Sequence, residues 1–166
     1  MKYIRIFMLC LFLWSIWKTI DVLLRTSSMD YLLFENVGYT WLFYVLAIAL
    51  LIALLGGFTF LITPKIRIFY VTSQIAVVLN LLFTAMSSIL AMRFPEQAQN
   101  AYTASREARG LSVHQATLDM MTNPVSHTIV LIVATGFAIL WLLLLNKIKN
   151  NPAFIKEIDD DSIDLD

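Results

Sequence analysis

Two long apolar runs joined by a short basic turn constrain this sequence most. Residues 41–62 and 68–92 carry no charged side chain, and only Thr63-Pro64-Lys65-Ile66-Arg67 separates them. Each run exceeds the roughly 20 residues that a helix rising about 1.5 Å per residue needs to cross a hydrocarbon core of about 30 Å. A joint this short permits only a tight antiparallel reversal. The pair therefore predicts a transmembrane helical hairpin.

The composition of the whole chain extends this interpretation. The 166 residues are 59% hydrophobic and their mean hydropathy is +0.75, whereas soluble domains are roughly 45–50% apolar. Two further apolar segments, residues 4–24 and 124–145, bring the predicted spans to four. We therefore expect an all-α integral membrane protein, an antiparallel four-helix bundle within residues 1–149, followed by an acidic cytoplasmic tail at 150–166.

The first span could be mistaken for a cleaved signal peptide. It leaves its apolar run through Trp14, Trp17, Lys18 and Asp21, whereas a cleavage site requires small residues there. We therefore interpret it as a retained transmembrane helix. The single cysteine, Cys10, excludes an internal disulfide.

The connection between the third and fourth spans, residues 93–123, is the largest segment expected outside the membrane. Pro95 suits the first turn of a helix that Gly110 can end. Ser112 with Gln115 matches a capping box that would begin a second short helix. We expect these two helices to form a small extracytoplasmic cap on the bundle.

The shorter connection, residues 25–38, contains the apolar run Tyr31-Leu32-Leu33-Phe34. Together with Tyr39 and Trp41, it supplies the aromatic belt that is typical of headgroup depth. This pattern predicts a loop held at the membrane interface.

Basic residues near the ends of the spans predict the orientation of the chain, because cytoplasmic loops carry an excess of them. One side holds Lys2, Arg5, Lys65, Arg67, Lys147 and Lys149, and the other holds Arg25, Arg93, Arg106 and Arg109. Both termini are therefore expected in the cytoplasm. In a bacterial inner (plasma) membrane the cap would face the periplasm.

Small residues at regular spacing indicate where helices pack closely. Ala49, Ala53 and Gly57 recur every four residues in the second span, with Gly56 beside them. Such spacing lets two backbones approach in lipid, within one monomer or between two copies. Further small packing positions in the fourth span are Ala134, Gly136 and Ala138.

Polar side chains inside the spans mark a candidate site. At 100° per residue, Cys10, Trp14, Lys18, Asp21 and Arg25 share a sector of about 80° on the first span, a face that we expect to avoid lipid. In the third span, a stripe about 60° wide contains Ser73, Asn80, Thr84 and Ser87, with Ser88 beside it. Asn80 lies near mid-depth, so its amide should find a partner inside the bundle.

These groups fall at one level near the outer leaflet. We hypothesise an outward-opening polar pocket formed by Lys18, Asp21, Arg25, Asn80, Thr84, Ser87, Ser88 and His127. Purely structural interpretations stand beside this one. Lys18 and Asp21 can pair within their helix, Lys18 can extend to the headgroups, and the hydroxyls can bond between helices.

Enzymatic and nucleic-acid-binding functions find little support in the sequence. We find no histidine pair at metal-ligand spacing, no glycine-rich phosphate loop and no basic face, so we expect no catalytic residue, cofactor, metal or nucleic acid. The hydropathy layout resembles that of the DsbB-type quinone-linked disulfide oxidases. Those enzymes need paired external cysteines, which this chain lacks, so the resemblance implies the layout alone.

Two functional hypotheses of different class follow. The first is a non-catalytic accessory or assembly subunit that docks in the lipid bilayer with another membrane protein or with copies of itself. The second is an oligomeric small channel or transporter that uses the polar line of Lys18, Asp21 and Asn80. An intramembrane enzyme or a lipid-binding protein is a further possibility.

Overall fold

The computed structural model describes residues 2–62 and 67–150, and within these ranges the regular structure is entirely helical. The all-α prediction is therefore confirmed. The turn at 63–66 and the acidic tail from residue 151 lie outside the described residues. The helices are α1 (Lys2–Leu24), α2 (Met29–Asn36), α3 (Thr40–Ile62), α4 (Arg67–Arg93), α5 (Pro95–Glu107), α6 (Gln115–Thr122) and α7 (Pro124–Lys149).

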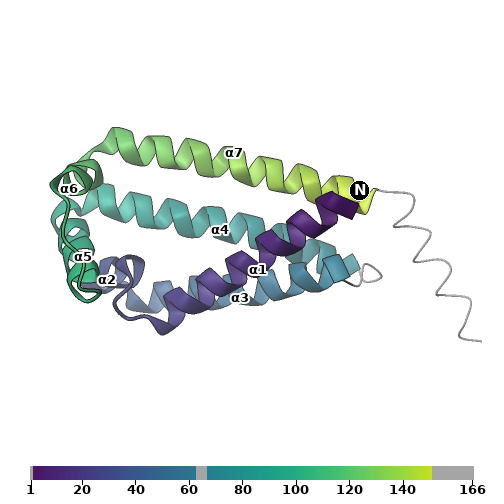
Figure 1. The fold of residues 1–166 in the computed structure, drawn as a ribbon, viewed down its shortest axis with the longest axis horizontal. Helices are drawn as coiled ribbons and strands as arrows, with labels where there is room; N and C mark the ends of the chain where they lie inside the picture. Colours follow the sequence, from purple (N-terminus) through teal and green to yellow (C-terminus); the bar gives the residue numbers. More distant parts are fainter. Residues whose placement is uncertain (1, 63–66, 151–166) are drawn as a thin grey trace, which may run out of the picture.

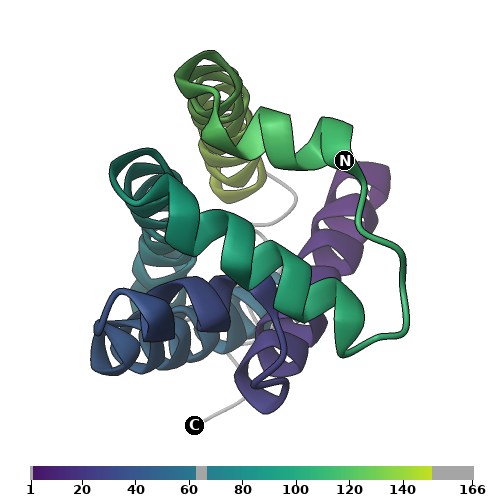
Figure 2. The same ribbon diagram turned by 90° about the vertical axis from the view of Figure 1, so that its left-hand side faces the viewer.

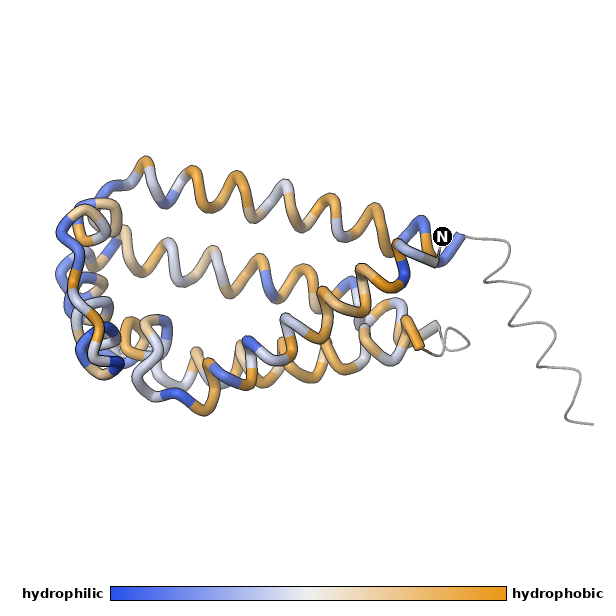
Figure 3. Tube along the Cα trace, viewed as in Figure 1, coloured by the Kyte–Doolittle hydropathy of each residue, from blue (hydrophilic) through white to orange (hydrophobic). Residues whose placement is uncertain are grey.

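Four of these helices, α1, α3, α4 and α7, are long and apolar enough to cross a membrane, with mean hydropathies between 1.8 and 2.8. They coincide with the four expected spans, and α7 continues to Lys149, beyond the expected end at residue 145. The long helices extend from one end of the molecule to the other (Figure 1). Figure 3 shows the same helices as mainly hydrophobic: hydrophilic segments lie where α1 begins and α7 ends, and more of them lie at the opposite end.

The short helices α2, α5 and α6 lie across that end (Figure 1 and Figure 2). Helix α2 corrects the expectation of a loop at residues 25–38. The Ser28 hydroxyl accepts a hydrogen bond from the backbone N–H of Tyr31 at 3.3 Å and begins the helix. Phe34 is fully buried and packs against Phe43 and Phe83, with ring centroids 5.8 and 6.0 Å apart. Aromatic packing thus draws the apolar run into the protein, so the cap includes α2 as well as the connection after α4.

The capping box expected at Ser112 and Gln115 is also wrong. Helix α6 begins at Gln115, but its N-cap is His114, whose side chain makes no capping hydrogen bond. Ser112 instead belongs to the preceding connection, where its carbonyl accepts a hydrogen bond from Arg106 Nε at 3.0 Å. The expected start of α5 at Pro95 is correct, and Gly110 follows the helix at φ 65°, a conformation that glycine adopts without strain.

Close packing centres on α3. Ala53 and Gly57 are buried there, and Gly57 lies between the Phe12 ring of α1 and the backbone of Ser73 in α4. The neighbouring Gly56 faces the Thr72 side chain of α4. Among the other predicted packing positions, Ala49 and Ala134 are partly buried and Ala138 is buried, but Gly136 is exposed with open space around it. Gly136 therefore makes no close packing contact with the described residues of this chain.

The four long helices do not pack equally against one another. Helix α3 packs on α1 and α4, and α4 packs on α7. Helices α1 and α7 meet toward the start of α1 and the end of α7, where the Phe12 and Trp141 rings make a T-shaped contact with centroids 5.2 Å apart. Toward the cap these two helices diverge (Figure 1 and Figure 2).

Candidate functional site

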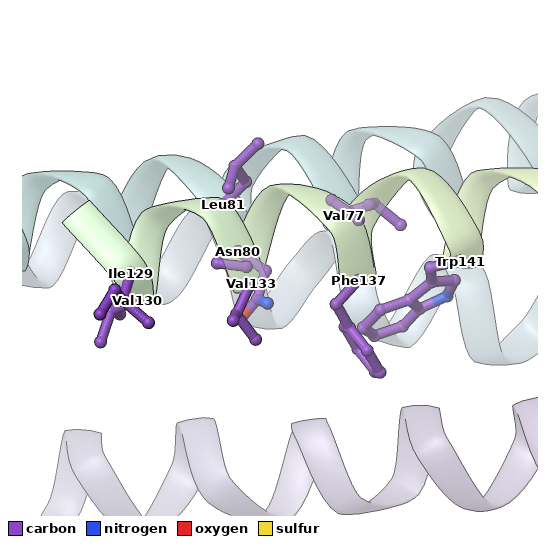
Figure 4. A pocket seen from close by; sticks show the side chains of 10 residues that line it. Val77, Asn80, Leu81, Ile129, Val130, Val133, Phe137 and Trp141 are labelled. Carbon is purple, nitrogen blue, oxygen red and sulfur yellow. The ribbon is translucent and has the colours of Figure 1, made fainter. Parts of the chain in front are cut away.

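A mainly apolar cavity of about 380 Å³ lies between α4 and α7, on the side that faces α1 (Figure 4). It is lined by Val77, Asn80, Leu81, Ile129, Val130, Val133, Ala134, Phe137, Ala138 and Trp141. The buried Trp141 closes its inner end through its contacts with Phe12 and Phe137. The cavity is therefore blocked toward the termini and continues toward the cap.

Asn80 is the polar residue halfway along this interior. Its backbone carbonyl accepts a hydrogen bond from Thr84 Oγ1 at 3.0 Å, but its side-chain amide makes no hydrogen bond to any described residue. The expectation of a partner inside the bundle was therefore wrong. The amide lies between the apolar cavity and a second cavity closer to the cap, so its polar atoms are available to whatever occupies them.

Two further cavities, with more polar groups in their lining than the mainly apolar cavity, continue from Asn80 toward the cap. The first, of about 230 Å³, is bounded by Lys18, Asp30, Asn80 and Thr84 among others. The second, of about 330 Å³, shares Asp30 and Thr84 with it. This second cavity also places together three residues of the hypothesised pocket, Ser87, Ser88 and His127.

The remaining predicted residues lie around a fourth cavity of about 260 Å³ beneath the cap. It is lined by Lys18 and Asp21 of α1, by Arg25 directly after α1, and by Arg109 from the connection after α5. The eight residues of the hypothesised pocket thus border neighbouring cavities at the cap end. They do not surround a single compact site, because Lys18, Asp21 and Arg25 face a different cavity from Ser87, Ser88 and His127.

Asp30 is a residue that the sequence interpretation missed. It lies in the first turn of α2 and lines both of the cavities that extend from Asn80 toward the cap. Burial raises the pKa of the Asp30 carboxyl above its ordinary value, while the Ser87 hydroxyl and the charge of Lys18 act in the opposite direction. The available signal was Ser28, which can cap a helix and place Asp30 inside its first turn.

The ionic contacts differ from the pair considered between Lys18 and Asp21. Asp21 instead bonds Arg25, with 2.6 Å between Oδ1 and Nε. The Lys18 ammonium lies 5.9 Å from the centroid of the Trp14 ring, and Arg109 donates hydrogen bonds to the carbonyl and hydroxyl oxygens of Ser105. Among the described residues, neither Lys18 nor Arg109 forms an ion pair with a carboxylate.

Most hydroxyls in the spans bond their own helix instead of a neighbouring one. Thr19 donates to the Ser15 carbonyl at 2.8 Å, and Ser73 donates to the Tyr70 carbonyl at 2.6 Å. Ser87 Oγ is buried and makes no hydrogen bond of regular geometry. His127 Nε2 lies 2.8 Å from the Met121 carbonyl oxygen, which ties the start of α7 to α6.

Metal-binding geometry does not occur in the part of the chain that the structure describes, where no three His, Cys, Asp or Glu side chains gather into a potential metal site. No protein-family model, curated protein or solved structure matches this chain. Its class therefore rests on its own features: four long apolar helices are consistent with a multi-pass membrane protein.

Proposed function

We propose that this chain is an integral protein of a bacterial inner membrane in which α1, α3, α4 and α7 form an antiparallel four-helix bundle. The distribution of basic residues near the helix ends supports cytoplasmic termini and a cap on the outer side. In this arrangement the cavities beneath α2 and α5 open toward the outer leaflet.

Within the membrane, the protein serves as a non-catalytic accessory or assembly subunit. The observation that carries this proposal is the divergence of α1 and α7 toward the cap (Figure 1). Ile129, Val133 and Phe137 remain exposed on α7 although each also lines the cavity beside α4. An apolar surface of this kind suits a docking helix of a partner membrane protein or a second copy of this chain.

An oligomeric channel or small transporter is the second candidate, favoured by the Asn80 amide, which bonds no described residue and borders a cavity lined by Lys18 and Asp30. Toward the termini, however, the interior is filled by packed side chains that include Phe12, Leu54 and Trp141. A path through a single copy is closed by this packing. Conduction would therefore require an interface between copies.

The orientation can be tested by labelling introduced cysteines in sealed cells, in a background where Cys10 is replaced by serine. A cysteine at position 65 should react only after the cells are opened, whereas one at position 106 should react from outside. Labelling of both positions from the same side would refute the topology.

The accessory role can be tested by isolating the tagged protein in a mild detergent and identifying what accompanies it. We expect a stoichiometric, unrelated membrane protein, and recovery of homo-oligomers alone would contradict that role. A leak assay on the protein reconstituted in vesicles separates this role from that of a channel or transporter. An accessory subunit should produce no ion or proton leak. A leak abolished by Asp21→Asn or Lys18→Met, in protein that still folds, would favour a channel instead.

A further inference from the structure

The neighbouring cavities that begin between α4 and α7 and end beside α1 and Arg109 change in polarity along the molecule. The cavity farthest from the cap is lined by apolar side chains such as Val77 and Phe137. Asn80 lies where it meets the next cavity, and the cavity nearest the cap is lined by ionisable residues. An elongated ligand that fits this series must have an apolar tail and a polar head. Membrane lipids have both.

The cavity of about 260 Å³ beneath the cap, here named the outer cavity, carries an excess of positive charge. Lys18, Arg25 and Arg109 contribute cations and Asp21 one anion. The pair between Asp21 and Arg25 is internally neutral, which leaves Lys18 and Arg109 without a carboxylate partner among the described residues. The ligand that complements this cavity is anionic.

The depth of Lys18 within the membrane span also favours an anionic ligand. It precedes the end of α1 at Leu24 by roughly 9 Å, at about 1.5 Å per residue. An ammonium group at such a depth in a membrane span is costly unless it meets a counter-ion or reaches the headgroups. Asp30 lines one of these cavities together with Lys18, but the two side chains do not form an ion pair.

We infer that this series of neighbouring cavities, from α4 and α7 to the end of α1, binds a lipid with an anionic phosphate headgroup. The headgroup lies against Lys18 and Arg109, and one acyl chain follows α4 and α7 past Asn80 toward Phe137. This inference rests on the proposed membrane placement, but it requires neither a protein partner nor a particular orientation. The lipid enters sideways from the bilayer, because the short helices α2, α5 and α6 lie across the end of the long helices (Figure 2).

The test uses the full chain in detergent micelles and measures binding of phosphatidylglycerol and phosphatidylcholine by native mass spectrometry. A basic residue near an anionic lipid contributes about a fivefold change in affinity. Lys18→Met and Arg109→Met should therefore each weaken phosphatidylglycerol binding about fivefold. The matched control is Arg93→Met, since Arg93 is exposed at the same end of the molecule but lines none of these cavities.

A variant that should bind phosphatidylglycerol more tightly excludes misfolding as the cause of weaker binding in the other variants. Asp21→Asn removes the anion from the outer cavity and releases Arg25 from its ion pair, so phosphatidylglycerol binding should tighten about fivefold. Phosphatidylcholine binding should change little in all variants. If Arg93→Met weakens binding as much as Lys18→Met, the attraction belongs to the whole surface and the inference is overturned.

Two further measurements separate a lipid from other occupants. Phosphatidylglycerol brominated in its acyl chains should quench Trp141 when Trp14, Trp17 and Trp41 are replaced by phenylalanine, and an absence of quenching would refute the position of the chain. Inorganic phosphate should not compete, and equal competition would identify a soluble-anion site instead. Binding that persists when the pull-down finds no partner would remove the accessory role but leave the lipid site standing.

Discussion

Replacing Gly57 by alanine tests whether α1, α3 and α4 are packed as the structure shows. A Cβ atom at this position would overlap the Phe12 ring and lie 3.0 Å from the Ser73 Cα. Carbon atoms are most favourably placed about 3.5–4.0 Å apart, so the helices must move by about half an ångström or the ring must turn. Such overpacking destabilises a protein by about 1–3 kcal/mol.

The surroundings of Gly57 leave little room for relief. The Ser73 contact is with backbone, and Phe12 is fully buried with its ring at 86° to that of Trp141. Turning the ring away would sacrifice an aromatic contact worth about 0.5–1.5 kcal/mol. We therefore expect the free energy of unfolding to fall by about 2 kcal/mol, within the range for overpacking.

The assay is reversible unfolding in mixed micelles at increasing fractions of a denaturing detergent. Gly136→Ala is the control, because Gly136 is also in a membrane-spanning helix but has open space around it. It should leave stability unchanged or raise it by up to about 1 kcal/mol. Adding Phe12→Leu to Gly57→Ala should restore part of the lost stability. Equal effects of the two glycine substitutions would refute the packing argument.

Two other predictions concern the cap. Phe34→Ala should lower the free energy of unfolding by about 3–5 kcal/mol, because it empties a fully buried site between Phe43 and Phe83, and proteolysis should then cleave α2 faster. Because burial raises the pKa of Asp30, the folded state binds a proton more tightly than the unfolded state, and stability should fall as pH rises above 3.8. Asp30→Asn should flatten this dependence in thermal unfolding measured from pH 4 to 7, and an unchanged slope would contradict the assignment.

The long helices could be predicted from the sequence because their signal is local. Runs such as residues 41–62 and 68–92 are uncharged for longer than a bilayer requires, whatever they pack against. Helix α2 was harder, since eight residues carry little periodic signal. Its stability depends on the tertiary contacts of Phe34 with Phe43 and Phe83, which the sequence does not reveal.

The candidate site was predictable in composition but not in arrangement. The depth argument selected residues that do line cavities at the cap end, including Thr84, Ser87 and His127. It could not divide them among separate cavities, because that division depends on how far α1 and α7 diverge. It also omitted Asp30 and Arg109, which reach these cavities from segments that were assigned to the outside.

Asn80 shows why the divergence of α1 and α7 matters for function. In a closed bundle its amide would have to bond a neighbouring helix, because an unsatisfied amide in an apolar interior costs several kcal/mol. Here the amide borders two cavities and bonds no described residue. Water or a ligand must therefore satisfy it, and water needs at least two polar partners to remain in a cavity. The apolar cavity beside Asn80 offers few, so a water that bonds this amide belongs in the second cavity, with Lys18, Asp30 and Thr84. An acyl ester at the same place would bring a carbonyl acceptor for the amide together with an alkyl chain that fills the apolar cavity.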